Sequence, residues 1–166
     1  MWRDDSKPGP KGDVFTHDGA GISKFSGDGK FIWRSKLADL YHFAVRPDGM
    51  LVGTCDHCKQ LRLMDPRDGR IIERWDEPKM DGDGFGPTNL DRDGNIYVHA
   101  YGSDSQLIFD PSGTYLGSDT RTTVGGPGAM APVFGKAGLG YLFVADGLLE
   151  LRVNLTANAP KEPSVD

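Results

Sequence analysis

Residues 86–118 read "GPTNLDRDGNIYVHAYGSDSQLIFDPSGTYLGS". Short runs rich in Val, Ile, Leu, Phe and Tyr alternate in this stretch with turn signals that contain Gly. Such runs predict strands, and Asp-Gly, Ser-Gly and Pro-x-Gly supply the positive φ angle that tight hairpins need. The stretch therefore predicts four antiparallel strands that are joined by two Gly turns and one short loop.

The same pattern stands earlier in the chain. The segment "RPDGMLVGT" (residues 46–54) matches "DRDGNIYVH" (residues 91–99), which places Gly49 and Gly94 45 positions apart. A period of 20–50 residues indicates a repeat architecture in which each repeat is one structural unit. Weaker copies of the same turn stand in "KGDVFTH" (residues 11–17) and "AGLGYLFVA" (residues 137–145).

A second series of turns keeps the same spacing. The segments "MDPRDGRII" (residues 64–72) and "FDPSGTYLG" (residues 109–117) share Asp-Pro and a later Gly, and "FSGDGKFIW" (residues 25–33) has a similar shape. We expect this element to join the third and fourth strands of each unit. Its Asp would cap the turn, its Pro would fix φ, and its Gly would adopt the left-handed conformation.

The two series together predict the fold class. A four-stranded antiparallel unit of about 40–45 residues is typical of a β-propeller blade, and no segment has the 3.6-residue period of a helix. We expect an all-β chain of about three and a half to four blades, the first without its inner strand and the last without its outer strand. The predicted blades are residues 13–35, 41–75, 86–118 and 130–155, between an N-terminal segment (1–12) and a loose C-terminal tail (156–166).

This number of blades does not close a ring, and an open ring exposes blade faces and strand edges. Three explanations stay open at this stage. The chain is a piece of a longer propeller, or another copy or another chain completes the ring. In the third explanation the ring is closed with four blades, and the missing strand comes from residues 1–8 or from the C-terminal tail.

At residues 86–118 the chain resembles an NHL-type repeat, with "DRDGNIYV" followed by a polar loop and a strand ending "FDPSG". Residues 41–75 resemble a weaker copy. The resemblance implies a propeller of the six-bladed superfamily, a fold that hosts unrelated activities. It implies a non-catalytic module that binds a protein or a small ligand through loops at one face. The candidate ligand-binding residues are Glu77, Asp81, Asp83, Phe85 and Asn89.

Three histidines are candidate metal ligands. His17 and His99 hold the same place in alternate blades, so both imidazoles would look toward one region; the simpler interpretation is a half-buried strand residue bonded to a neighbouring loop. His42, in "YHFAV", resembles a zinc-binding His of the peptidyl-hydroxyglycine amidating lyases, although Tyr41 replaces the Pro of that motif and Thr88 stands at the matching place in the next blade. The alternative function is therefore a metal-dependent lyase or hydrolase with a His-containing site near the axis.

Other cation sites are weaker predictions. Gluconolactonase-like propellers bind a divalent metal through the Asn of "Pro-Asn-Gly", and Asn89 stands one place later, which turns its amide to the other face of the strand. The loop "EPKMDGDGFG" (residues 77–86) resembles a fragment of a calcium loop, but lacks the acids of a complete one. No cofactor is required, and zinc or calcium is the candidate ion.

Composition narrows the function classes. The 166 residues predict one domain, and a net charge of −5 argues against a nucleic-acid or anionic-membrane binder. No apolar run approaches the roughly 18 residues that a membrane helix needs, and the first residues do not resemble a signal peptide. We expect a soluble protein, cytoplasmic or a mature or excised segment. Cys55 and Cys58 are structural thiols, a local disulfide, or a metal or redox site.

Overall fold

The computed structural model describes residues 5–18, 20–35, 40–55, 59–76, 84–101, 105–120, 133–134, 139–144 and 147–152. Within them every regular element is a strand. The strands form three antiparallel sheets of four strands and one of three. The first sheet comprises β1 (Asp5–Pro8), β2 (Val14–His17), β3 (Ile22–Phe25) and β4 (Phe31–Arg34).

The other sheets repeat this order along the chain. The second comprises β5 (Leu40–Val45), β6 (Leu51–Cys55), β7 (Gln60–Met64) and β8 (Ile71–Asp76). The third comprises β9 (Gly84–Leu90), β10 (Ile96–Tyr101), β11 (Ser105–Phe109) and β12 (Tyr115–Thr120). The fourth comprises β13 (Val133–Phe134), β14 (Leu139–Val144) and β15 (Gly147–Arg152). None of the described residues forms a helix of the length and apolarity that a membrane crossing would need.

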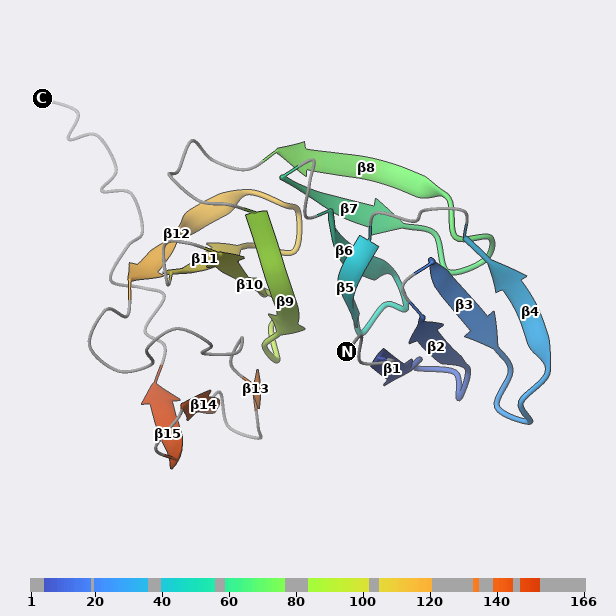
Figure 1. Cartoon of the computed structure of the whole chain (residues 1–166), viewed down its shortest axis with the longest axis horizontal. Coiled ribbons are helices and arrows are strands. Elements are labelled where there is room, and N and C mark those ends of the chain that lie inside the picture. The colour runs from blue at the N-terminus through green and yellow to red at the C-terminus, as the bar shows by residue number, and fades with distance from the viewer. Residues whose placement is uncertain are drawn as a thin grey trace, which may run out of the picture.

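The sheets follow one another around an arc, as propeller blades do (Figure 1). Their first strands, β1, β5, β9 and β13, lie on the inner side of the arc and contact one another in succession. Their last strands, β4, β8 and β12, lie on the outer side. The predicted fold class is therefore confirmed: all-β, with four-stranded antiparallel blades.

The inner strand of the first sheet comes from the N-terminal part of the chain. β1 pairs with β2, with Asp5 opposite His17 and Pro8 opposite Val14. This strand lies inside the segment 1–12 that the sequence analysis set apart from the first blade, and within the residues that one alternative named as the source of the missing strand. The first sheet thus has all four strands.

The Gly turns occupy equivalent places in successive sheets. Gly49 and Gly94 close the hairpins between the first and second strands, with φ angles of 89° and 85°. Their amides donate to the carbonyls of Arg46 and Asp91, at 2.8 and 3.2 Å. A side chain is strained at such φ angles, so the 45-residue spacing of these glycines reflects a backbone requirement.

Apolar side chains fill the two seams between the first three sheets. Because side chains alternate along a strand, the second sheet presents one apolar face to the first sheet and the other to the third. The first seam contains Phe15, Ile22, Leu40, Phe43, Leu51 and Met64. The second seam contains Val52, Leu61, Trp75, Phe85, Ile96, Val98, Ala100, Leu107 and Phe109.

Candidate functional site

The hairpin between β7 and β8 is held by its own Asp. The Asp65 Oδ1 atom accepts hydrogen bonds from the Arg67 amide at 2.8 Å and from Arg67 Nε at 2.9 Å, and Oδ2 accepts from Arg67 Nη2 at 2.5 Å. The side chain of Asp65 is almost completely buried. The hydrogen bonds from Arg67 hold the pKa of Asp65 well below its usual range, and Asp65 in turn raises the pKa of Arg67.

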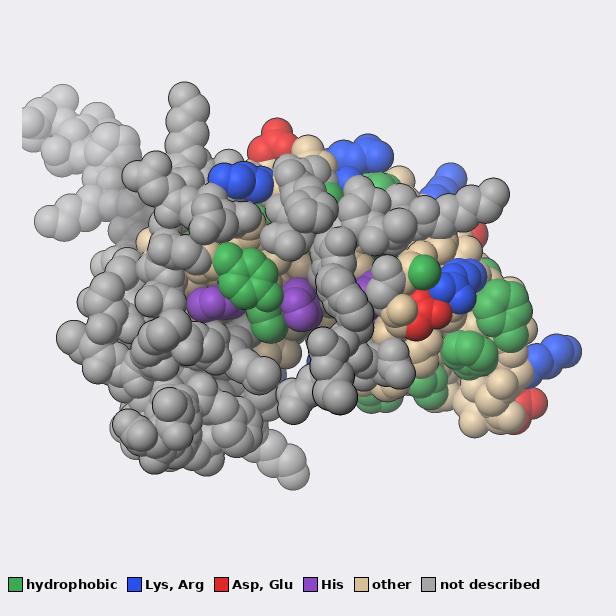
Figure 2. Space-filling view, in the orientation of Figure 1, with side chains coloured by type: hydrophobic (Ala, Val, Ile, Leu, Met, Phe, Trp, Pro, Cys, Tyr) green, Lys and Arg blue, Asp and Glu red, His purple; other side chains and the backbone are tan. Residues whose placement is uncertain are grey.

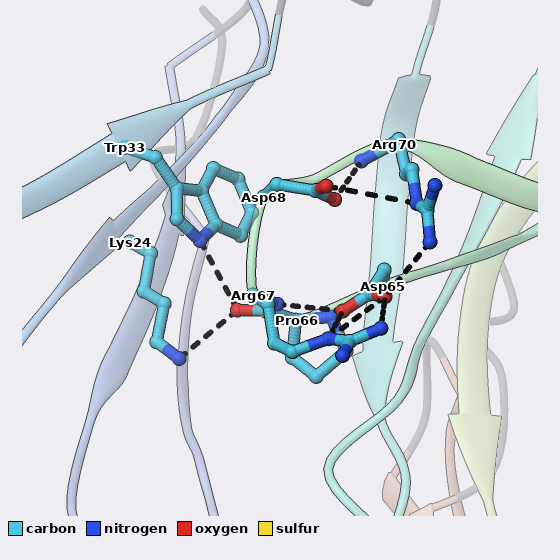
Figure 3. Close-up of polar contacts among 7 residues, drawn as sticks. All are labelled: Lys24, Trp33, Asp65, Pro66, Arg67, Asp68 and Arg70. Carbon is cyan, nitrogen blue, oxygen red and sulfur yellow. Dashed lines mark hydrogen bonds and ion pairs between the residues drawn. The ribbon is translucent and has the colours of Figure 1, made fainter.

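The same hairpin is the contact point for the first sheet (Figure 3). The Pro66 carbonyl accepts hydrogen bonds from Lys24 Nζ at 3.0 Å and from Trp33 Nε1 at 3.1 Å. Lys24 also forms an ion pair with Asp13 at 2.6 Å, and the side chains of both residues are only 15% exposed. A Cβ atom at Gly69 would meet the Trp33 ring at 2.6 Å. The Asp-Pro-x-x-Gly element therefore joins two blades as well as two strands.

The second seam uses the same construction with other donors. Arg46 Nη1 donates to the Pro111 carbonyl at 2.9 Å, and the Trp75 ring covers Gly113. Ser112 and Thr114 replace the arginine as partners of Asp110, whose Oδ1 accepts from the Ser112 hydroxyl at 2.6 Å and from the Thr114 amide at 2.9 Å. The predicted roles of Asp and Gly in this turn are confirmed, because φ is 73° at Gly69 and 87° at Gly113.

A groove of about 450 Å³ opens at the outer end of the first seam. Arg34 forms two contacts of 2.7 Å with the Asp18 carboxylate. Arg70 lies 3.6 Å from Asp68 and 3.8 Å from Asp65. Arg74 is exposed and has no ion pair with a described residue. The groove is lined by Arg34, Ser35, Asp68, Gly69, Arg70, Ile71 and Arg74.

The lining of the groove carries more basic than acidic side chains, whereas the whole chain has a net charge of −5. Its lining holds three arginines and one aspartate. In the space-filling view, separate basic side chains lie over β8, with an acidic one near one end (Figure 2). The sequence analysis missed this site. Its signal was present in the repeat, because the second copy has Arg67, Arg70 and Arg74 where the third has Ser112, Thr114 and Ser118.

The predicted histidine ligands His17 and His99 point toward different neighbouring sheets. His17 is buried on the face of the first sheet that carries Phe15, which packs against the second sheet. His99 alternates with Val98 and Ala100, so it points away from the second sheet; its Nδ1 lies 3.4 Å from Gln106 Nε2. Among the described residues no group of three His, Cys, Asp or Glu side chains has the arrangement of a metal site.

His42 is half-buried in β5, opposite Thr54. The register also corrects the sequence alignment at this strand. Gly53 and Val98 are equivalent, and their partners are Phe43 and Thr88. Thr88 therefore corresponds to Phe43, and the residue that corresponds to His42 is Pro87. Thr54 holds the position of His17 and His99 in its own sheet. Its hydroxyl lies 3.3 Å from the His42 carbonyl of the same sheet and 3.3 Å from the Gly86 carbonyl of the next sheet, and its one hydrogen can be donated to either.

The predicted ligand-binding residues divide into three groups. Phe85 has no exposed surface and belongs to the core of the second seam, because β9 begins at Gly84 and draws Phe85 into the sheet; its ring is therefore not a ligand contact in this structure. Asn89 is half-buried opposite Tyr97. Glu77, Asp81 and Asp83 lie outside the described residues, as does the loop of residues 122–130.

Cys55 is completely buried at the end of β6 and is disulfide-bonded. The alternative of a free structural thiol at this position is therefore wrong. The chain has one other cysteine, Cys58, which lies outside the described residues.

No protein-family model matches the sequence, and no curated protein matches it either. Solved structures do. A protein of unknown function from Bacteroides caccae is 17% identical with a TM-score of 0.68, over 95% of this chain and 59% of that one. A streptogramin B lyase is 14% identical with a TM-score of 0.68, over 89% and 53%. YCF48 bound to a D1 peptide is 13% identical with a TM-score of 0.63, over 86% and 47%.

These similarities establish the fold alone. The structures are propellers, so the chain has a β-propeller fold. The chain spans about half the length of the solved structures that it resembles.

Proposed function

We propose that the chain is a non-catalytic propeller module, of the NHL-like kind, that binds a segment of a partner protein. The observation that carries the proposal is the open groove at the first seam. In the second seam the corresponding space is filled by Trp75. Trp75 stands four residues after the first residue of β8, and Ser35 stands four residues after the first residue of β4, so the two positions are equivalent. Trp75 is 8% exposed and packs in the core of its seam.

The size and lining of the groove support this proposal. A volume of about 450 Å³ falls in the range of ligand pockets, roughly 300–1,000 Å³. The comparison with YCF48, which was solved with a D1 peptide bound, supports a peptide as the kind of ligand that a propeller of this shape accepts. The loops of residues 77–83 and 122–130 are further proposed contacts at one face of the ring.

A peptide selection tests the proposal. Twelve-residue peptides displayed at random are selected on the immobilised chain, and the enriched peptides are labelled and titrated by fluorescence anisotropy. Ser35→Trp is the matched variant, because it places in the first seam the residue that fills the second. We expect peptides that bind the native chain and lose affinity for Ser35→Trp, with folding checked by circular dichroism. No enriched peptide, or equal binding to the folded variant, would contradict the proposal.

The second candidate is a metal-dependent lyase or hydrolase. The observation that favours it is the similarity to a streptogramin B lyase, at 14% identity. Its proposed ligands are His42, His17 and His99, with zinc or calcium as the ion. Metal analysis of the purified chain separates the two functions, since stoichiometric zinc or calcium that is lost in His42→Ala would favour the enzyme.

We also propose that further blades, from a second copy or from another chain, complete the ring. The first sheet exposes Phe31 (56%) and Ile32 (49%), and the chain spans about half the length of the propellers that it resembles. Light scattering on the purified chain tests this point. A mass of twice 18.1 kDa would support pairing of two copies, and a monomer at high concentration would rule out that pairing.

A further inference from the structure

We propose that the groove at the first seam selects an acidic, extended peptide, which Arg70 and Arg74 recognise through its carboxylates. This inference rests on the proposed binding function and adds the chemistry of the ligand to it.

The first step is the supply of free guanidinium donors. Arg67 is committed to Asp65, with contacts of 2.5–3.1 Å. Arg70 reaches the Asp68 and Asp65 carboxylates only at 3.6 and 3.8 Å, beyond the 2.7–2.9 Å of a charge-assisted hydrogen bond. Arg74 has no ion pair with a described residue. Two planar groups with several free donors therefore face the groove, and such groups suit carboxylates.

The second step is the placement of two arginines on one face of the second sheet. Arg74 lies directly opposite Arg62 across β7 and β8, and Arg62 is 8% exposed. A carboxylate bound beside Arg74 therefore lies near two positive charges, which favours an anionic ligand at this position.

The third step separates ligand binding from folding. The third sheet builds the same hairpin and the same outer strand without arginine. The third sheet pairs Leu107 with Ser118 at the place where the second sheet pairs Arg62 with Arg74. It has Thr114 in place of Arg70. The blade frame does not need these cationic side chains, so their presence at the open seam requires another reason.

The fourth step concerns the class of ligand. β4 and β8 are the outermost strands of their sheets, and each leaves one edge without a neighbouring strand in its sheet. An extended peptide can use such an edge, and Gly69 and Ile71 add a backbone and an apolar contact to the lining. A nucleic acid fits less well, because its affinity depends on many phosphate contacts and the chain as a whole carries a net charge of −5.

Two labelled decapeptides test the inference, one of alternating Glu and Val and one of alternating Lys and Val. Binding to the native chain is measured by fluorescence anisotropy at low and moderate salt. We expect the acidic probe to bind, more weakly as salt increases, and the basic probe not to bind. Arg74→Ser and Arg70→Thr, which copy the third sheet, should each weaken binding of the acidic probe about 10-fold, which is about 1.4 kcal/mol in binding free energy.

The control is Lys30→Ser, which removes the same charge from an exposed turn outside the groove and should change affinity less than about twofold. Equal binding of the two probes, native affinity in the arginine variants, or tighter binding of a ten-base single-stranded DNA would overturn the inference. Peptides selected on the native chain that are neutral yet lost in Ser35→Trp would overturn it too, while leaving the binding function intact.

Discussion

The two seams between the first three sheets share one design and differ in one place. In both, a tryptophan from the outer strand of one sheet covers the turn glycine of the next, Trp33 over Gly69 and Trp75 over Gly113. In both, a proline carbonyl of that turn accepts a hydrogen bond from a basic side chain of the preceding sheet. These shared contacts explain why Asp-Pro and Gly recur in the sequence.

The difference lies in where the tryptophan stands. The residue of the first sheet that is equivalent to Trp75 is Ser35. Trp33 lies inside β4, two residues before Ser35. The second seam is closed at this point, and the first is left open and lined with arginine. What repeats from blade to blade is therefore required for folding, and what departs from the repeat marks a candidate functional surface.

The largest effect should come from Trp75→Ala. This ring is 8% exposed inside the second seam, and truncation of a buried tryptophan costs about 3–5 kcal/mol in the free energy of unfolding. Trp33→Ala should cost clearly less, because the Trp33 ring is partly exposed beside the groove. Urea unfolding of the two variants measures the contrast.

Ile32→Ala is the control for both tryptophan variants, since Ile32 is 49% exposed and its truncation should change the free energy of unfolding by no more than about 0.5 kcal/mol. An equal loss in the free energy of unfolding for Trp33→Ala and Trp75→Ala would contradict the distinction between an open and a closed seam.

The second contrast is electrostatic and is tested with Asp65→Asn. The pKa of Asp65 lies below its usual range in the folded state because Arg67 donates to its carboxylate. Such a group stabilises the fold above the ordinary Asp pKa near 3.9, and this stabilisation is lost as the pH falls through the lower folded pKa. Asp65→Asn should therefore lower the melting temperature at pH 7. The difference in melting temperature between the variant and the native chain should become smaller below about pH 4.

Asp110→Asn is the matched variant in the second seam. Burial acts to raise the pKa of Asp110, but hydrogen bonds from Ser112 and Thr114 outweigh it and leave the pKa lowered. Since these donors are neutral, the gap in melting temperature should be smaller than for Asp65→Asn at pH 7. A gap for Asp65→Asn that does not vary with pH would show that the ion pair with Arg67 contributes nothing.

The third contrast concerns the basic donors to proline. Arg46→Met keeps the aliphatic stem and removes the donor to the Pro111 carbonyl. We expect a loss of about 1.5–3 kcal/mol in the free energy of unfolding, the range for a hydrogen bond that involves a charged group. Asp48→Asn is the control, because its ion pair with Arg46 has a 50% exposed carboxylate and should contribute less than about 1 kcal/mol. Equal losses would assign the effect to the exposed pair.

The sequence was sufficient for the blades because their turns are local. Asp-Gly and Asp-Pro turns fix φ angles within four or five residues, and Gly49, Gly69, Gly94 and Gly113 all adopt the expected positive φ. The inner strand β1 was not recognised as a strand, because "DSKP" contains no β-branched or aromatic residue. Its place is set by pairing with β2, which no property of the segment itself indicates.

The site was harder to predict because it depends on register between sheets. The sequence predicts a loop at Phe85, but β9 begins one residue earlier and buries it. The sequence alignment matches Thr88 with His42, which is wrong by one residue, and such a shift moves a side chain to the other face of a strand. The groove was missed because it forms between the end of β4 and the start of β8, residues more than 30 positions apart.

The smallest predicted effect tests the position that holds His17, Thr54 and His99 in successive sheets. The Thr54 hydroxyl lies 3.3 Å from the Gly86 carbonyl across the second seam and 3.3 Å from the His42 carbonyl in its own sheet, and Thr54 is completely buried. Thr54→Val keeps the shape of the side chain and should cost about 0.5–1.5 kcal/mol in the free energy of unfolding, the range for one neutral hydrogen bond.

The partly exposed Thr16 lies one residue before the equivalent position in the first sheet, and Thr16→Val is therefore the control, with an expected change within about 0.5 kcal/mol. A measurable loss for Thr54→Val alone would mean that the buried hydroxyl at this position contributes to stability through a carbonyl of its own sheet or of the next one. The histidines at the same position in the neighbouring sheets would then have a structural role to fill, which needs no metal. Equal results for the two valine variants would remove that argument.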